Sequence, residues 1–148
     1  MTLELDDREA RDTPRASALH GGSARWVGAG GKRYIADIYP LGLAIPAVAG
    51  IFILAKPRSP LAQSWTALYV GADADLRAAI RDTKRHPHLW NFAVELGLTA
   101  IHLVTAAASA AERHDIARDL IRSLLPSLNR ETAAMQRSGL GTNLGITT

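Results

Sequence analysis

The chain has 148 residues, enough for one ordinary domain with a buried core and too few for two. Hydrophobic residues make up 47% of it and aromatic residues only 5%, so the core must be built mainly from aliphatic side chains. The absence of cysteine excludes a disulfide scaffold, a thiolate nucleophile and a cysteine-ligated zinc site, and favours the cytoplasm. The net charge is +3 and arginine outnumbers lysine 14 to 3, a bias that suits phosphate binding but also arises from coding composition alone.

The two ends of the chain differ from its middle. Residues 1–31 are polar, charged and rich in glycine and serine, which predicts a flexible N-terminal arm. Residues 138–148 have no apolar face and predict a flexible tail, so residues 32–137 are the expected domain. The first ten residues are too acidic for a signal peptide. The longest apolar run, residues 41–55, contains Pro46 and is shorter than the roughly 18 residues that span a bilayer, so we expect no membrane association.

Four segments have the pattern of strands. Residues 33–39 alternate polar and apolar side chains and stop at Pro40, which is typical of an edge strand. Residues 48–55 form a continuous apolar run, as central strands do. Residues 65–70 predict a further strand that ends at Gly71, and the β-branched residues 99–105 predict the last one. Within that last strand we expect His102 to be half-exposed.

Two helices are predicted between the last two strands. Asp73 and Asp75 are N-cap candidates for the first, which ends before Pro87. The second covers residues 88–96, and Gly97 is well placed to stop it. The stripe that the first helix buries is Leu76, Ala79, Ile80 and Thr83.

A third helix is predicted near the end of the domain. Ser109 and Glu112 form a capping box, in which each side chain can satisfy the other residue's free backbone N–H group. Pro126 ends the helix. Its buried stripe is Ile116, Leu120, Ile121 and Leu124.

Two of the expected strands resemble the signature of the GIY-YIG endonucleases. The first strand carries Gly50, Ile51 and Phe52, and the second carries Tyr69, Val70 and Gly71 before a helix follows. Residues 120–129, with Pro126 and Asn129, resemble the family's third motif, a helix that ends in proline with asparagine soon after. The likeness covers about residues 32–129. It implies an α/β (α+β) domain with a three-stranded antiparallel sheet flanked by helices.

The resemblance also implies an activity, the cleavage of DNA phosphodiesters with one divalent metal ion such as Mg²⁺. In the family a helix glutamate holds the metal, a tyrosine helps to activate water, an arginine on the first helix steadies the phosphate, and an asparagine supports the site. Tyr69 and Asn129 match that tyrosine and that asparagine, so both are candidate catalytic residues. Each also has a structural explanation: Tyr69 can pack one face of its strand, and Asn129 can bond the backbone where the helix stops.

Four positions depart from the family's pattern. The first-motif tyrosine is replaced by Phe52, and the residue after the second motif, often basic in the family, is Ala72. The arginine position falls at Ala79 and the glutamate position at Ala117. Hard divalent ions require anionic oxygen ligands, so we expect cleavage to be absent or weak and no cofactor to be bound unless the domain is active.

Helix geometry gives the missing charges no obvious substitute. At about 100° per residue, Asp115 and Asp119 lie roughly 160° around the helix from Ala117. Arg77 and Arg81 lie equally far from Ala79, so both are expected to point elsewhere.

Charged residues around the first helix are candidates for contact with nucleic acid. They are Arg77, Arg81, Lys84 and Arg85, together with Trp90. Cations attract phosphates and an indole can stack on a base, although a solvated loop with Trp90 anchored in the core explains the same pattern. His86 and His88 lack a third ligand, so no metal site is predicted there.

Three functions remain open from the sequence. The first is a non-catalytic domain that binds DNA or another nucleic acid, aided by the basic residues between positions 15 and 33. The second is a protein-interaction or self-associating module that docks through the apolar segment 40–48. The third is an active endonuclease whose displaced metal site recruits His114 or Asp82.

Overall fold

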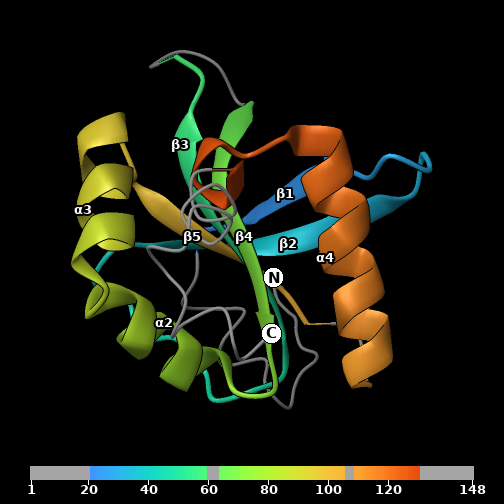
Figure 1. The fold of residues 1–148 in the computed structure, drawn as a ribbon, viewed down its shortest axis with the longest axis horizontal. Helices are drawn as coiled ribbons and strands as arrows, with labels where there is room; N and C mark the ends of the chain where they lie inside the picture. Colours follow the sequence, from blue (N-terminus) through green and yellow to red (C-terminus); the bar gives the residue numbers. More distant parts are fainter. Residues whose placement is uncertain (1–20, 60–63, 106–108, 131–148) are drawn as a thin grey trace, which may run out of the picture.

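The computed structural model describes residues 21–59, 64–105 and 109–130, which form one antiparallel sheet with helices packed on it (Figure 1). The sheet has five strands in the order β1-β2-β5-β3-β4 and curls into a half-barrel. In chain order the elements are β1 (Ser23–Val27), β2 (Arg33–Pro40), β3 (Gly50–Pro57), β4 (Trp65–Asp73), α2 (Leu76–Lys84), α3 (Pro87–Leu96), β5 (Ala100–Val104) and α4 (Ala110–Leu124).

The expected three-stranded sheet is wrong by two strands. β1 and β2 form a hairpin that extends the sheet beyond β5, with Ser23 opposite Asp37 and Val27 opposite Arg33. β1 lies within residues 1–31, so ordered structure begins before the expected domain start. The sequence pattern did not predict β1, because only one large side chain among its five residues, that of Trp26, points into the core. Residues 1–20 and the expected tail lie outside the described residues.

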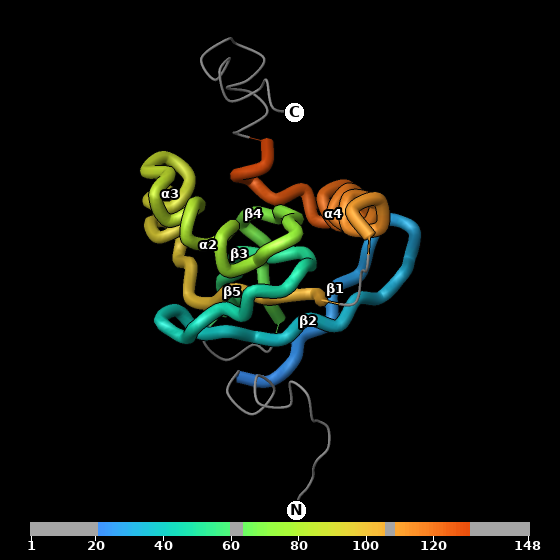
Figure 2. Tube along the Cα trace, turned by 90° about the horizontal axis from the view of Figure 1, so that it is seen from below, coloured from blue at the N-terminus to red at the C-terminus, as the bar shows by residue number. Residues whose placement is uncertain are grey.

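β3 lies between β4 and β5 and explains the continuous apolar run in the sequence. Its side chains alternate between two clusters on opposite faces of the sheet. The α4-side cluster is Trp26, Tyr34, Ala36, Ile51, Ile53, Ala55, Ala67, Val70, Val104, Ala117 and Leu120. The α2–α3-side cluster is Tyr39, Ile45, Phe52, Leu54, Leu68, Leu76, Ile80, Ala93, Leu98, Ile101, Leu103 and Leu128. Figure 2 shows α4 on one side of β3 and β4, and α2 with α3 on the other.

A β-bulge interrupts the pairing of β3 with β4. Leu54 is opposite Tyr69, whereas Ala55 is opposite Ala67, which leaves Leu68 as the extra residue. Leu68 and Tyr69 therefore both pack with the α2–α3-side cluster. β4 also runs on to Asp73, so the expectation that Gly71 ends the strand is wrong.

The helix ends follow the local sequence signals. The Asp75 side chain accepts a hydrogen bond from Ala78 N at the start of α2, and Gly97 has a φ of 109° at the end of α3. Ser109 and Glu112 form the expected capping box of α4. Among the described residues, no helix is both long and apolar enough to cross a membrane.

Candidate functional site

The two residues that align with the motif tyrosines lie side by side on β3 and β4. The rings of Phe52 and Tyr69 have centroids 5.9 Å apart. A Cβ atom on Gly71 would come within 2.5 Å of the Phe52 ring, and one on Gly50 within 2.4 Å of the Val104 carbonyl oxygen. Both motif glycines are thus explained by close packing.

Tyr69 is half-buried against the α2–α3-side cluster. Burial raises the pKa of its hydroxyl above the usual value of 10.0, so the hydroxyl is protonated at neutral pH. Its surroundings therefore favour the packing explanation over a role in deprotonating water.

The two alanines at the aligned charged positions lie on opposite faces of the sheet. Ala79 is half-buried beside the α2–α3-side cluster, with Phe52 and Tyr69. Ala117 is buried in the α4-side cluster. The described residues contain no group of three or more histidines and carboxylates that could hold a metal ion. The positions that would carry the nuclease chemistry are therefore not gathered around one cleft.

Asn129 joins the end of the chain's last described turn to β4. Its Oδ1 accepts a hydrogen bond from Val70 N at 2.8 Å, and its Nδ2 donates to Val70 O at 3.0 Å. The amide of Asn129 thereby imitates a neighbouring strand at the edge of the sheet. The sequence explanation that Asn129 bonds the backbone is correct, but its partner is β4 and not the preceding helix.

Replacing Asn129 with alanine is expected to lower the free energy of unfolding by about 1–3 kcal/mol, because both Val70 backbone groups lose their partner. Urea unfolding of Asn129→Ala measures the loss. Asn129→Asp should be destabilised too, since a carboxylate cannot donate to Val70 O. Wild-type stability in both variants would show that this pair of bonds contributes little.

The cationic end of α2 brings together most of the predicted nucleic-acid contacts. Arg81, Lys84 and Arg85 are exposed, and the Lys84 ammonium lies 5.6 Å from the centre of the half-buried Trp90 ring. An Asp82 carboxylate oxygen lies 3.7 Å from Arg81 Nε. Both side chains are more than half exposed, so this ion pair is weak and leaves Arg81 available to other anions. The surface therefore carries an excess of positive charge next to an indole.

Arg77 stands apart from this group. Its Nε donates to the Ile45 carbonyl at 2.8 Å, so it ties the start of α2 to the segment before β3. His86 is the N-cap of α3, and its Nδ1 accepts from Leu89 N at 3.4 Å. This role accounts for His86 without a metal.

The apolar segment 40–48 is only partly available as a docking surface. Leu41 and Val48 are 40% and 39% exposed, whereas Ile45 is buried in the α2–α3-side cluster. Val48 O also accepts a hydrogen bond from Leu76 N at 2.8 Å. The segment therefore serves first to hold α2 against the sheet.

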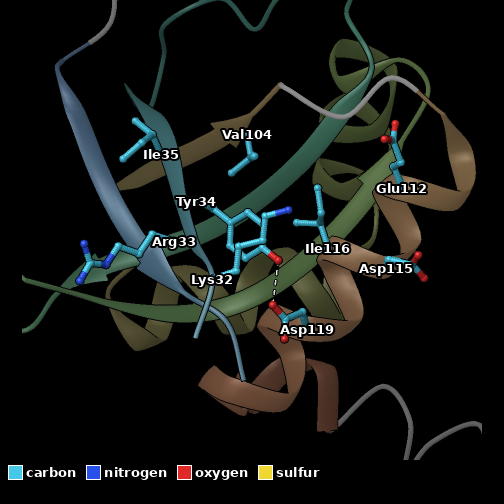
Figure 3. Close-up of a pocket in the computed structure, with 9 residues that line it drawn as sticks. All are labelled: Lys32, Arg33, Tyr34, Ile35, Val104, Glu112, Asp115, Ile116 and Asp119. Atoms are coloured by element: carbon cyan, nitrogen blue, oxygen red, sulfur yellow. Dashed lines mark hydrogen bonds between the residues drawn. The ribbon is translucent and has the colours of Figure 1, made fainter. Parts of the chain in front are cut away.

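A groove of about 650 Å³ lies between β2 and α4 (Figure 3). The Tyr34 hydroxyl donates to Asp119 Oδ2 at 2.7 Å, and Gly30 N donates to Oδ1 at 3.0 Å. A Cβ atom on Gly28 would come within 1.8 Å of Asp119 Oδ2, so a side chain at this position would have to displace the Asp119 carboxylate. Asp119 thus clamps the turn between β1 and β2 to α4, a role that the sequence did not reveal because the contact spans 89 positions.

The surroundings of Tyr34 in this groove argue against a catalytic role for its hydroxyl group. Burial, the hydrogen bond to Asp119 and its negative charge raise the pKa of Tyr34 to about 12. The same bond and that from Gly30 lower the pKa of Asp119. Glu112 and Asp115 of α4 also line the groove, while Figure 3 shows the Arg33 guanidinium directed away from Tyr34. A phenol this hard to ionise is a structural donor and not a nucleophile.

His102 is fully buried on β5, so the expectation of half-exposure is wrong. Trp26 Nε1 donates to His102 Nδ1 at 3.0 Å, and the ring of Trp65 meets His102 edge-on with centroids 4.5 Å apart. Because Nδ1 accepts, the neutral ring carries its proton on Nε2, which has no hydrogen-bond partner among the residues that the structure describes. The half-barrel covers His102 with β1, a strand that the sequence did not predict.

Comparison with protein-family models, with curated proteins and with solved structures finds no match for this chain.

Proposed function

We propose that this chain is a GIY-YIG-like domain that binds nucleic acid and is impaired in cleavage. The proposal of nucleic-acid binding rests on one observation: Arg81, Lys84 and Arg85 form an exposed group with the indole of Trp90 beside it. Phosphates bind cations through the release of counterions, and an aromatic side chain adds stacking on a base. Duplex or single-stranded nucleic acid is the partner class that this surface fits best.

The arrangement of the elements supports the GIY-YIG-like part of the proposal. From β3 onward the chain runs through two strands, two helices, a strand and a helix, and β4, β3 and β5 are neighbours in one antiparallel sheet. Phe52 of the first motif stands opposite Gly71 of the second. The two motifs are thus adjacent, as their resemblance to the family implies.

The aligned alanines support impaired cleavage. Ala79 and Ala117 provide neither the cation nor the metal ligand of the family, and they lie on opposite faces of the sheet. The alternative of a displaced metal site, with His114 or Asp82 as a ligand, gains no support, because the described residues contain no group of three or more histidines and carboxylates that could hold a metal ion. The protein-interaction alternative has one observation in its favour, the partial exposure of Leu41 and Val48.

Binding is tested with a labelled DNA duplex and a matched single strand over a series of salt concentrations. Lys84→Glu/Arg85→Glu should weaken binding at least about tenfold and make the slope of log affinity against log salt shallower by about 2. Arg118→Glu/Arg122→Glu makes the same change in charge on exposed positions of α4 and should leave affinity nearly unchanged. Absence of binding at low salt, or equal loss in both variants, would contradict the proposed surface.

A further inference from the structure

The open side of the half-barrel contains a slot between the two edge strands of the sheet. β1 forms one wall, the start of β4 forms another, and Ser123 and Leu124 of α4 also line it. Its volume of about 560 Å³ lies within the range of small-molecule sites, on the order of 300–1,000 Å³. The slot is at the start of β4, whereas α2 follows the end of that strand, so it is separate from the cationic end of α2.

The slot is positively charged. Arg25 of β1 and Arg58, just after β3, are exposed and line it. None of its described lining residues is acidic, and neither arginine has a carboxylate partner in the described parts of the chain. Guanidinium groups bind phosphate oxygens through paired N–H donors, so the slot favours an anionic ligand.

The slot also contains an aromatic surface that is fixed in advance. Trp65 is half-buried: it packs against the α4-side cluster and lines the slot as well. His102, buried on the central strand β5, contacts the rings of both Trp65 and Trp26, at centroid distances of 4.5 Å and 5.5 Å. Because these contacts come from the interior, the indoles are held in place without a ligand.

We infer that this slot binds a nucleotide unit, with its base on Trp65 and its phosphate between Arg25 and Arg58. An indole face suits any base, and two guanidinium groups suit a phosphate. A free nucleotide and one nucleotide of a single strand offer the same chemistry. The slot does not use the residues of the proposed surface on α2, so either site can exist without the other.

Quenching of tryptophan fluorescence tests the inference, with AMP and a short oligo-dA as the two probes. Saturable quenching is expected, with at least about tenfold weaker binding in Arg25→Glu and in Arg58→Glu. Arg118→Glu, the same charge change on α4, should bind as the wild type does, and Trp65→Phe should lose most of the quenching. Circular dichroism checks that each variant is folded. Both arginines are exposed, so neither substitution is expected to unfold the domain. If Arg25→Glu does unfold, Arg58→Glu alone tests the inference.

The two probes distinguish the source of the ligand. Similar affinity for AMP and oligo-dA assigns the slot to free nucleotides, and much tighter binding of oligo-dA assigns it to a strand. Absence of saturable quenching by either probe, or equal affinity in Arg58→Glu and the wild type, would overturn the inference. Loss of duplex binding in Lys84→Glu/Arg85→Glu with unchanged AMP binding would leave the slot in place and concern only the surface on α2.

Discussion

Acidification from about pH 6.5 to about pH 4 is expected to reduce the free energy of unfolding by about 3 kcal/mol through His102 alone. Burial lowers the pKa of His102 from 6.5 to about 4. Below pH 6.5 the unfolded chain therefore takes up a proton that the folded chain resists, so stability falls as the pH falls through this window. Above pH 6.5 both states are neutral at this position and the effect disappears.

Urea unfolding of the wild type and of His102→Gln between pH 4 and pH 7.5 measures this effect. Glutamine keeps an acceptor for Trp26 Nε1 but does not titrate, so the stability of His102→Gln should depend much less on pH. His114→Gln, on the exposed side of α4, should retain the wild-type profile. Asp119, whose pKa is lowered from 3.8, loses its contribution only at more acidic pH. Parallel profiles for the wild type and His102→Gln would contradict the assignment.

Ala117→Glu introduces the glutamate that the GIY-YIG endonucleases carry at the aligned position, and is expected to destabilise the domain by about 3–5 kcal/mol and to create no nuclease. Ala117 is buried with Ile51 and Leu120, so a carboxylate there loses most of its hydration. Arg113, one turn earlier on α4, is also buried, and pairing with it would offset only part of that cost. Urea unfolding and plasmid cleavage with Mg²⁺ measure the two parts of this expectation.

The matched control for this variant is Ala111→Glu, an exposed position in the first turn of the same helix. A carboxylate at a helix N-terminus interacts favourably with the helix dipole, so the control should unfold at or above the wild-type urea concentration. A variant Ala117→Glu that is as stable as the wild type and cleaves DNA with Mg²⁺ would contradict the burial of this position in the α4-side cluster.

The helices and the three strands of the motif region could be predicted because their signals are local. Asp75, Gly97 and the pair Ser109 and Glu112 act on backbone groups within a few residues, and each is found in its expected role. Helix periodicity also correctly separated Asp119 from Ala117: the first faces the turn between β1 and β2, and the second faces the sheet.

The features that could not be predicted from the sequence depend on contacts between distant parts of the chain. Trp26 joins His102 across 76 positions, and Asn129 joins Val70 across 59. The alternating pattern around His102 is the same whether the strand is half-covered or fully covered, so its burial becomes visible only when β1 is placed. The same is true of the slot, because its two arginines come from segments that a linear pattern does not connect.

A plasmid-nicking assay tests most directly the proposal that the domain binds DNA without cleaving it. The assay is run under conditions in which DNA binding has already been measured. Supercoiled plasmid is incubated with the wild type and Mg²⁺ or Mn²⁺, with EDTA as the control, and is separated by electrophoresis. The expected result is bound but intact supercoiled plasmid with either metal. Metal-dependent nicking that Tyr69→Phe abolishes would contradict it, and would show that the domain cleaves DNA through Tyr69 despite Ala79 and Ala117.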